Sequence, residues 1–154
     1  MTGYGGGASS LGLPDAGLAR YTEMVDRVEK IALATTTPLI ADGDTGYGGL
    51  LNVDHTVRGY ERAGACGIQL EDQEYPKKCG HPPKRRVIAL EDMVAKIRVA
   101  TSARESDDFI IIARTDARSE HGIDDAIRRG QAFADEGADV VFVEAPESID
   151  EMEK

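Results

Sequence analysis

Short apolar runs alternate with longer stretches of helical periodicity along most of this chain. Four runs, at residues 38–41, 67–70, 109–113 and 140–143, are rich in Ile, Leu or Val and do not alternate with polar residues. Strands that are buried on both faces of a parallel sheet have this pattern. Apolar residues recur three and four positions apart over residues 21–32, 53–64, 90–101 and 123–134, as on the buried face of a helix. The alternation predicts an α/β protein with helices outside a parallel sheet.

The composition narrows the classes of function. The chain has 154 residues, with 18 Lys and Arg against 28 Asp and Glu, for a formal net charge of −10. Because phosphate binding needs clustered cations, we do not expect nucleic-acid binding. No stretch approaches the roughly 20 apolar residues of a membrane span, and the first ten residues do not resemble a secretory signal. Two Cys are too few for a disulfide framework, which favours a reducing, cytoplasmic compartment.

Charged residues follow each apolar run. Asp42 and Asp44 follow the first run, Glu71 the second, Arg114 the third and Glu144 the fourth. The carboxyl ends of parallel strands meet at one edge of a sheet, where such folds bind their ligands. We therefore expect these side chains to share one site.

Three of these carboxylates, on Asp42, Asp44 and Glu71, predict a divalent cation site. Hard oxygen ligands without a nearby His or Cys pair suit Mg²⁺, or alternatively Mn²⁺, better than Zn²⁺. The alternative is that these acidic residues only end strands and cap the next helices. The glycine-rich residues 43–49 are interpreted as a tight metal loop rather than a phosphate cradle, since they match neither the dinucleotide fingerprint nor a P-loop.

A second chemical signal lies in residues 71–81, which run from a strand end into a loop. Cys79 follows two Lys and precedes Gly80 and His81, and nearby positive charge favours the reactive thiolate form of a cysteine. Such a residue can transfer a proton or act as a nucleophile. The alternative is an ordinary surface cysteine in a basic loop. Cys66, between a helix and a strand, is expected to be a small core residue.

Two further features are expected to carry no chemistry. The cluster of Lys84, Arg85 and Arg86 has no interleaved aromatic residues and is interpreted as a solvated loop before the third amphipathic helix. His55 and His121 stand in polar surroundings.

Together these segments resemble the isocitrate lyase and phosphoenolpyruvate mutase superfamily over essentially the whole chain. The most specific match is the loop sequence KKCGH at residues 77–81. The other matching segments, in chain order, are SLGLPD at 10–15, DGD at 42–44, NV at 52–53, EDQ at 71–73, ARTDA at 113–117 and VEA at 143–145.

The resemblance implies a (β/α)₈ TIM barrel, usually a homotetramer, with Mg²⁺ at the carboxyl ends of the strands. It assigns Asp42 and Asp44 as residues that hold the metal, and Glu71 as a residue that supports the metal through a water molecule. It makes Cys79 the acid that protonates the product carbanion.

The resemblance also implies a set of substrate contacts. Thr2, Gly3 and Tyr4 fall in a loop that grips the 2-oxo-acid portion of the substrate. Gly80 and His81 would contact the carboxylates of the substrate, and Arg114 would form an ion pair with a carboxylate. Glu144 lies in the same pocket.

The Cys-containing loop favours the lyase branch. The expected activity is Mg²⁺-dependent cleavage of a carbon–carbon bond in a 2-hydroxydicarboxylate, similar to 2,3-dimethylmalate or methylisocitrate. The partner is thus a small di- or tricarboxylate. A phosphonomutase of the carboxyphosphonoenolpyruvate type is the alternative within the superfamily, and a catalytically inactive fragment or binding module is the alternative outside it.

On this alignment, residues 1–154 form a partial TIM-barrel catalytic domain that contains about strands 3–6 with their helices. Half a barrel leaves two unpaired sheet edges, and no base for the substrate hydroxyl is identified within the chain. A homo-oligomer is expected for the full-length enzyme.

Overall fold

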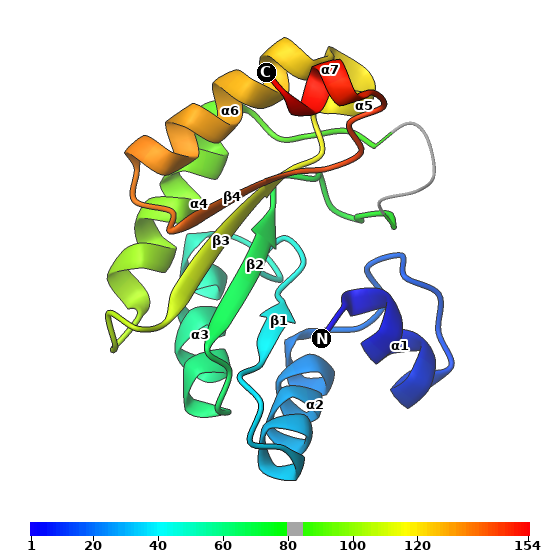
Figure 1. Cartoon of the computed structure of the whole chain (residues 1–154). Helices are drawn as coiled ribbons and strands as arrows, with labels where there is room; N and C mark the ends of the chain where they lie inside the picture. The colour runs from blue at the N-terminus through cyan, green and yellow to red at the C-terminus, as the bar shows by residue number, and fades with distance from the viewer. Residues whose placement is uncertain (80–84) are drawn as a thin grey trace.

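The computed structural model of the chain describes residues 1–79 and 85–154. It contains one sheet, whose strands stand in the order β1–β2–β3–β4 with every neighbouring pair parallel (Figure 1). The strands are β1 (Ile40–Asp42), β2 (Gly67–Glu71), β3 (Ile110–Thr115) and β4 (Val140–Val143). Because spatial order follows chain order, each connection crosses over the sheet through helical structure. The predicted α/β class with a parallel sheet is confirmed.

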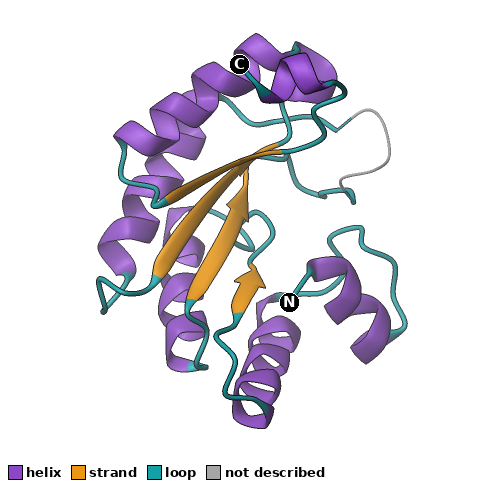
Figure 2. Ribbon diagram, in the orientation of Figure 1, coloured by secondary structure: helices purple, strands orange, loops and turns teal. Residues whose placement is uncertain are grey.

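Helices α3, α4 and α6 cover one face of the sheet (Figure 2), and each packs against the next. The helices are α1 (Gly3–Leu11), α2 (Tyr21–Ala34), α3 (Leu50–Arg62), α4 (Leu90–Ala103), α5 (Arg118–His121), α6 (Ile123–Asp135) and α7 (Ile149–Met152). The four amphipathic stretches of the sequence correspond to α2, α3, α4 and α6. Within residues 1–79 and 85–154, no helix is long and apolar enough to cross a membrane.

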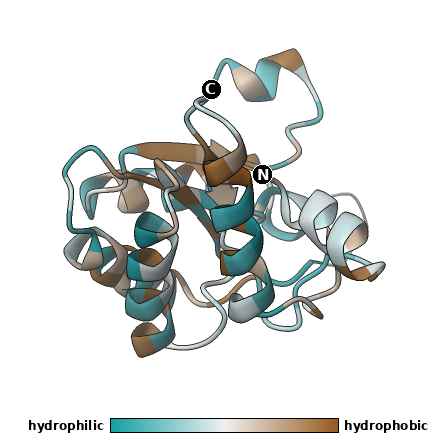
Figure 3. Cartoon of the chain, turned by 90° about the horizontal axis from the view of Figure 1, so that it is seen from below, coloured by the Kyte–Doolittle hydropathy of each residue, from teal (hydrophilic) through white to brown (hydrophobic). Residues whose placement is uncertain are grey.

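The core lies between the sheet and these helices. Val57 of α3 and Ile97 of α4 are fully buried, as are Ile68 of β2 and Ile111 of β3. Figure 3 shows the same arrangement, with hydrophobic strands in the centre and hydrophilic segments on the outer helices. Burial of a large aliphatic side chain contributes about 1.5–3 kcal/mol, so this layer fixes how the strand ends stand relative to one another.

Three strands, β1, β2 and β3, end one or two residues beyond the predicted apolar runs. Glu71 is the last residue of β2, and Arg114 lies inside β3 directly opposite it in the strand register. The ladder continues past the apolar run because the Asp72 N–H donates to the Arg114 carbonyl over 3.2 Å. Regular backbone pairing between the strands, rather than a flexible loop, thus fixes the positions of Glu71 and Arg114.

The predicted loop at Thr2, Gly3 and Tyr4 is wrong, because these residues form the N-cap and the first turn of helix α1 (Gly3–Leu11). The Thr2 hydroxyl accepts a hydrogen bond from the Gly5 N–H over 2.9 Å and caps the helix. Gly12 ends it with φ of 64°, a left-handed conformation that favours glycine. The cap at each end stabilises a helix whose glycine content alone disfavours it.

Cys66 is exposed, which corrects its expected place in the core. Its backbone belongs to the sheet layer, since its N–H donates to the Leu39 carbonyl over 2.7 Å. It directly precedes β2, so its thiol lies at the amino edge of the sheet, opposite the edge that carries the site residues.

Candidate active site

A cavity of about 350 Å³ opens at the carboxyl edge of the sheet. It collects side chains from the ends of β1, β2 and β3, from the residue after β4, from the start of α1 and from the segment that carries Cys79. The lining residues are Thr2, Tyr4, Asp15, Asp42, Glu71, Lys77, Lys78, Cys79, Arg114 and Glu144. Most of the predicted site residues thus share one cavity, while Gly80 and His81 lie outside the described residues.

Gly3 and Asp44 lie directly beside this cavity. The Gly3 N–H donates to Asp42 Oδ2 over 2.9 Å, and the Asp44 N–H donates to Asp42 Oδ1 over 3.0 Å. A Cβ atom at Gly3 would lie only 2.9 Å from Asp44 Oδ1. A larger residue at position 3 would therefore displace these two carboxylates, so residues 2–4 all lie at the site.

Lys77 is the main site residue that sequence reasoning missed. Its side chain is 3 % exposed, and its ammonium forms ion pairs with Asp15 and with Asp44 Oδ1, the latter at 2.8 Å. Burial disfavours the charge, but the Asp44 and Glu71 carboxylates outweigh burial and raise the pKa of Lys77. The signal was present in the sequence as the first of two adjacent lysines, although their charge was assigned to Cys79.

The acidic groups at the strand ends are held in an unfavourable electrostatic state. Burial and then the Asp42 charge raise the pKa of Asp44 to about 6, against the opposing effect of Lys77. Burial also raises the pKa of Glu71 well above its usual value. A cation bound between these groups would relieve both effects.

The donor atoms present suit a hard divalent cation. Glu71 Oε1 is buried and has no hydrogen-bond partner in the described part of the chain, whereas Asp44 Oδ1 has the Lys77 ammonium as its ion-pair partner. Carboxylate oxygens are the ligands that Mg²⁺ prefers. Within the same part, no three His, Cys, Asp or Glu side chains converge closely enough to hold a metal ion. The chemistry of the residues therefore fits Mg²⁺, while the carboxylates stand around Lys77 rather than around a common metal centre.

Arg114 is oriented by carboxylates on several sides. Its Nε and Nη2 donate to the two oxygens of Asp116 over 3.0 and 2.9 Å. Nη2 also lies 3.2 Å from Glu144, and Nε lies 3.7 Å from Glu71. Burial opposes its charge, but the Asp116 carboxylate leads the groups that raise the pKa of Arg114. A guanidinium fixed in this way is suited to pair with a substrate carboxylate.

A buried layer of charge supports Arg114 from behind. The Asp116 N–H donates to Asp72 Oδ1 over 2.9 Å, and Arg129 Nη1 of α6 donates to Asp72 Oδ2 over 3.2 Å. Arg85 is 3 % exposed and lies 3.2 Å from Asp116 Oδ1. The predicted solvated loop at residues 84–86 is therefore wrong for Arg85, because Asp116 provides a buried partner that lies far away in the sequence.

Cys79 is half-buried and lines the cavity from the segment that follows β2. Its N–H donates to the Asp15 carbonyl over 3.2 Å. This segment, which ends at the grey trace in Figure 1, therefore lies beside the loop that follows α1. The thiol is thus brought to the same cavity as Arg114 and the strand-end carboxylates.

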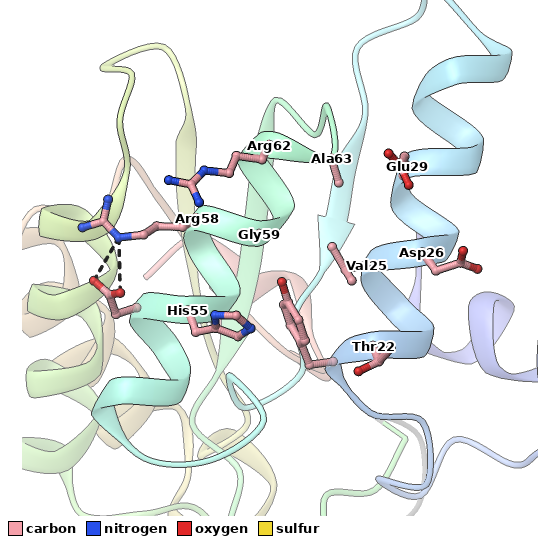
Figure 4. A pocket seen from close by; sticks show the side chains of 11 residues that line it. Thr22, Val25, Asp26, Glu29, His55, Arg58, Gly59, Arg62 and Ala63 are labelled. Atoms are coloured by element: carbon pink, nitrogen blue, oxygen red, sulfur yellow. Dashed lines mark hydrogen bonds and ion pairs between the residues drawn. The ribbon is translucent and has the colours of Figure 1, made fainter.

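A larger cavity of about 450 Å³ lies between α2 and α3 (Figure 4). Acidic Asp26 and Glu29 line it from α2, and Arg58 and Arg62 line it from α3. The His55 ring packs against the Tyr21 ring, with the ring centroids 4.4 Å apart and the ring planes tilted by 50°. None of the predicted site residues lines this cavity within the described ranges, so we place the candidate active site at the carboxyl edge of the sheet.

Comparisons with known proteins find relatives that match over the whole length of the chain. The family described as phosphoenolpyruvate phosphomutase matches residues 1–154. The 2,3-dimethylmalate lyase of Eubacterium barkeri is 53 % identical over 154 residues, which are 100 % of this chain and 53 % of that protein. The chain therefore spans about half the length of the curated relatives that it matches.

Two solved structures extend the comparison. Oxaloacetate acetylhydrolase in complex with the inhibitor 3,3-difluorooxalacetate matches with a TM-score of 0.95 and 42 % identity, over 99 % of this chain and 52 % of that one. Phosphonopyruvate hydrolase in complex with oxalate and Mg²⁺ matches with a TM-score of 0.85 and 36 % identity, over 98 % of this chain and 53 % of that one. Such neighbours are TIM-barrel enzymes, so the fold described above corresponds to about half of a barrel.

Proposed function

Since the chain belongs to the phosphoenolpyruvate phosphomutase family, we propose that its cavity is the active site of a Mg²⁺-dependent carbon–carbon lyase. The proposed substrate is a 2-hydroxydicarboxylate similar to 2,3-dimethylmalate or methylisocitrate, which is cleaved to a 2-oxo acid and a carboxylate. The observation that carries the proposal is the convergence of Cys79, Arg114 and the strand-end carboxylates on one cavity. Its similarity to a 2,3-dimethylmalate lyase supports the same reaction class.

The residues divide into two groups by their chemistry. Asp42, Asp44 and Glu71 would hold Mg²⁺, and a bound Mg²⁺ would supply positive charge for the oxyanion that develops as the bond breaks. The Mg²⁺ and oxalate named for phosphonopyruvate hydrolase support a site of this kind. Lys77 balances part of the negative charge and holds Asp15 and Asp44 in place.

The second group binds the substrate. Arg114 pairs with one substrate carboxylate, and Glu144, 3.2 Å from it, limits how the guanidinium can turn. Thr2, Gly3 and Tyr4 contact the 2-oxo-acid portion where α1 begins beside the carboxylates. Gly80 and His81, assigned by resemblance to the remaining carboxylate, stay predictions.

Cleavage requires one proton to leave the substrate and another to arrive. A general base, to which no residue of this chain is assigned, takes the hydroxyl proton as the carbon–oxygen bond becomes a carbonyl. The carbon–carbon bond breaks, and its electron pair moves to the carbon beside the other carboxylate. That carbanion takes the proton from Cys79 Sγ, which faces the cavity. A positioned general acid contributes a factor of about 10²–10⁴ in rate.

The test replaces Cys79 by Ser and measures release of the 2-oxo acid. The Cys79→Ser variant is expected to lose at least about 10²-fold in kcat, while Cys66→Ser, a matched change at the opposite sheet edge, keeps full activity. Assays use the 154-residue chain and, in parallel, its full reading frame. Undiminished turnover by Cys79→Ser would contradict the role of this residue, and no turnover by either protein would favour a binding module.

A phosphonate reaction is the second candidate, because the chain also resembles phosphonopyruvate hydrolase. A panel of 2-alkylmalates, methylisocitrate, oxaloacetate and phosphonopyruvate separates the two. Turnover of phosphonopyruvate alone would support the second candidate and exclude the lyase.

A further inference from the structure

Gln73 is a buried side chain that the proposed chemistry does not use. It is 2 % exposed and stands two residues after the end of β2. Its Oε1 accepts a hydrogen bond from the Lys78 N–H over 2.9 Å, and its Nε2 donates to the Lys78 carbonyl over 2.9 Å. The carboxamide thus makes with one residue the pair of hydrogen bonds that a neighbouring strand makes in a sheet.

The residue that Gln73 holds lies immediately before Cys79. Lys77, on the other side of Lys78, is fixed through its ammonium to Asp15 and Asp44. The Cys79 N–H donates to the Asp15 carbonyl over 3.2 Å. Residues 77–79 are therefore each held by a polar interaction. The hydrogen bonds at Lys78 act on its backbone, so they set the direction in which the chain enters Cys79.

Gln73 is itself held firmly enough to serve as a reference point. It forms an antiparallel bridge with Val87, and the next residue, Glu74, donates its N–H to the Arg86 carbonyl over 2.8 Å. On its other side, Asp72 is fully buried and accepts a hydrogen bond from Thr115 Oγ1 over 2.7 Å. Because the neighbouring backbone is held by these hydrogen bonds, the buried Gln73 amide loses little conformational freedom when it binds the Lys78 backbone.

We propose that Gln73 is a positioning residue that fixes Cys79 at the cavity through its two hydrogen bonds to the Lys78 backbone. The catalytic meaning of this inference rests on the proposed function, in which Cys79 is the proton donor. The positioning itself does not, because it concerns where the thiol is held and not what it does.

The test measures alkylation of the two cysteines by iodoacetamide in EDTA, with each site quantified by mass spectrometry. Cys66, exposed at the opposite edge of the sheet, is the internal reference. Gln73→Met keeps the size of the side chain and removes both hydrogen bonds. The ratio of the Cys79 rate to the Cys66 rate is expected to rise roughly tenfold, which corresponds to a loss of about 1.4 kcal/mol.

Two further variants keep the test decisive. Gln73→Glu retains an acceptor for the Lys78 N–H but sets a second oxygen against the Lys78 carbonyl, so its ratio is also expected to rise. Gln131→Met, the same change at an exposed position of α6, is expected to leave the ratio unchanged. A ratio within about twofold of the unmodified protein in both Gln73 variants, or an equal rise at both cysteines, would overturn the inference. If Cys79→Ser keeps full turnover, the proposed function fails while this ratio still reports on Gln73.

Discussion

At the scale of single residues, buried charge determines how firmly the site is held. Asp72 accepts hydrogen bonds from Thr115 Oγ1, the Asp116 N–H and Arg129 Nη1 at 2.7, 2.9 and 3.2 Å. Asp72→Ala removes the acceptor for all three and leaves part of a buried guanidinium charge unpaired, so we expect it to lower the free energy of unfolding by about 3 kcal/mol. Urea unfolding followed by circular dichroism measures this loss.

The matched control is Asp26→Ala, which removes an exposed ion pair with Lys30 and should cost less than about 1 kcal/mol. Equal losses in the two variants would show that Asp72 does not support the fold.

The partners of single charged side chains could not be predicted from the sequence. Residues 77–81 pointed to Cys79, but the ammonium of Lys77 pairs with Asp15 and Asp44, and Arg85 pairs with Asp116. These partners are distant in sequence, so no local pattern predicts them.

At the scale of elements, α1 depends on its caps. Glycine disfavours a helix interior by about 1 kcal/mol relative to alanine, and this helix contains Gly3, Gly5, Gly6 and Gly7. Thr2→Val removes the hydroxyl that caps the Gly5 N–H, which should destabilise the helix by about 1 kcal/mol and increase amide exchange at Gly5 and Gly6 roughly fivefold. Hydrogen exchange followed by NMR measures the change.

Thr22→Val makes the same change at an exposed position of α2 and should leave exchange in α1 unaltered, whereas Thr2→Ser should retain protection. Unchanged exchange in Thr2→Val would mean that the cap is unimportant.

The contrast with α2, α3, α4 and α6 explains why those helices could be predicted. Their apolar stripes record the face that they bury, while α1 carries no such stripe and is defined by one hydroxyl and by Gly3 packing against carboxylates.

At the scale of the whole molecule, the order of the strands follows from the alternation of elements, and with it the edge at which the site residues meet. Sequence could not show how those residues share charge. After burial, the Asp42 charge helps to raise the pKa of both Asp44 and Glu71, and the Lys77 ammonium opposes both effects. These charge interactions exist only once β1, β2 and the Cys79 segment have packed together. They make the free energy of unfolding depend on pH.

The folded protein holds a proton on Asp44 more tightly than the unfolded chain, because burial and Asp42 raise its pKa from 3.8 to about 6. This contribution to stability is complete below about pH 4 and is lost as the pH rises through 6. In EDTA, we therefore expect the unmodified protein to lose about 1–3 kcal/mol more than Asp44→Asn between pH 4 and pH 7, measured by urea unfolding at each pH. Asp26→Asn, the same change at an exposed aspartate, should follow the unmodified protein. A pH dependence in Asp44→Asn equal to that of the unmodified protein would show that the Asp44 carboxylate is already charged well below pH 6 in the folded state.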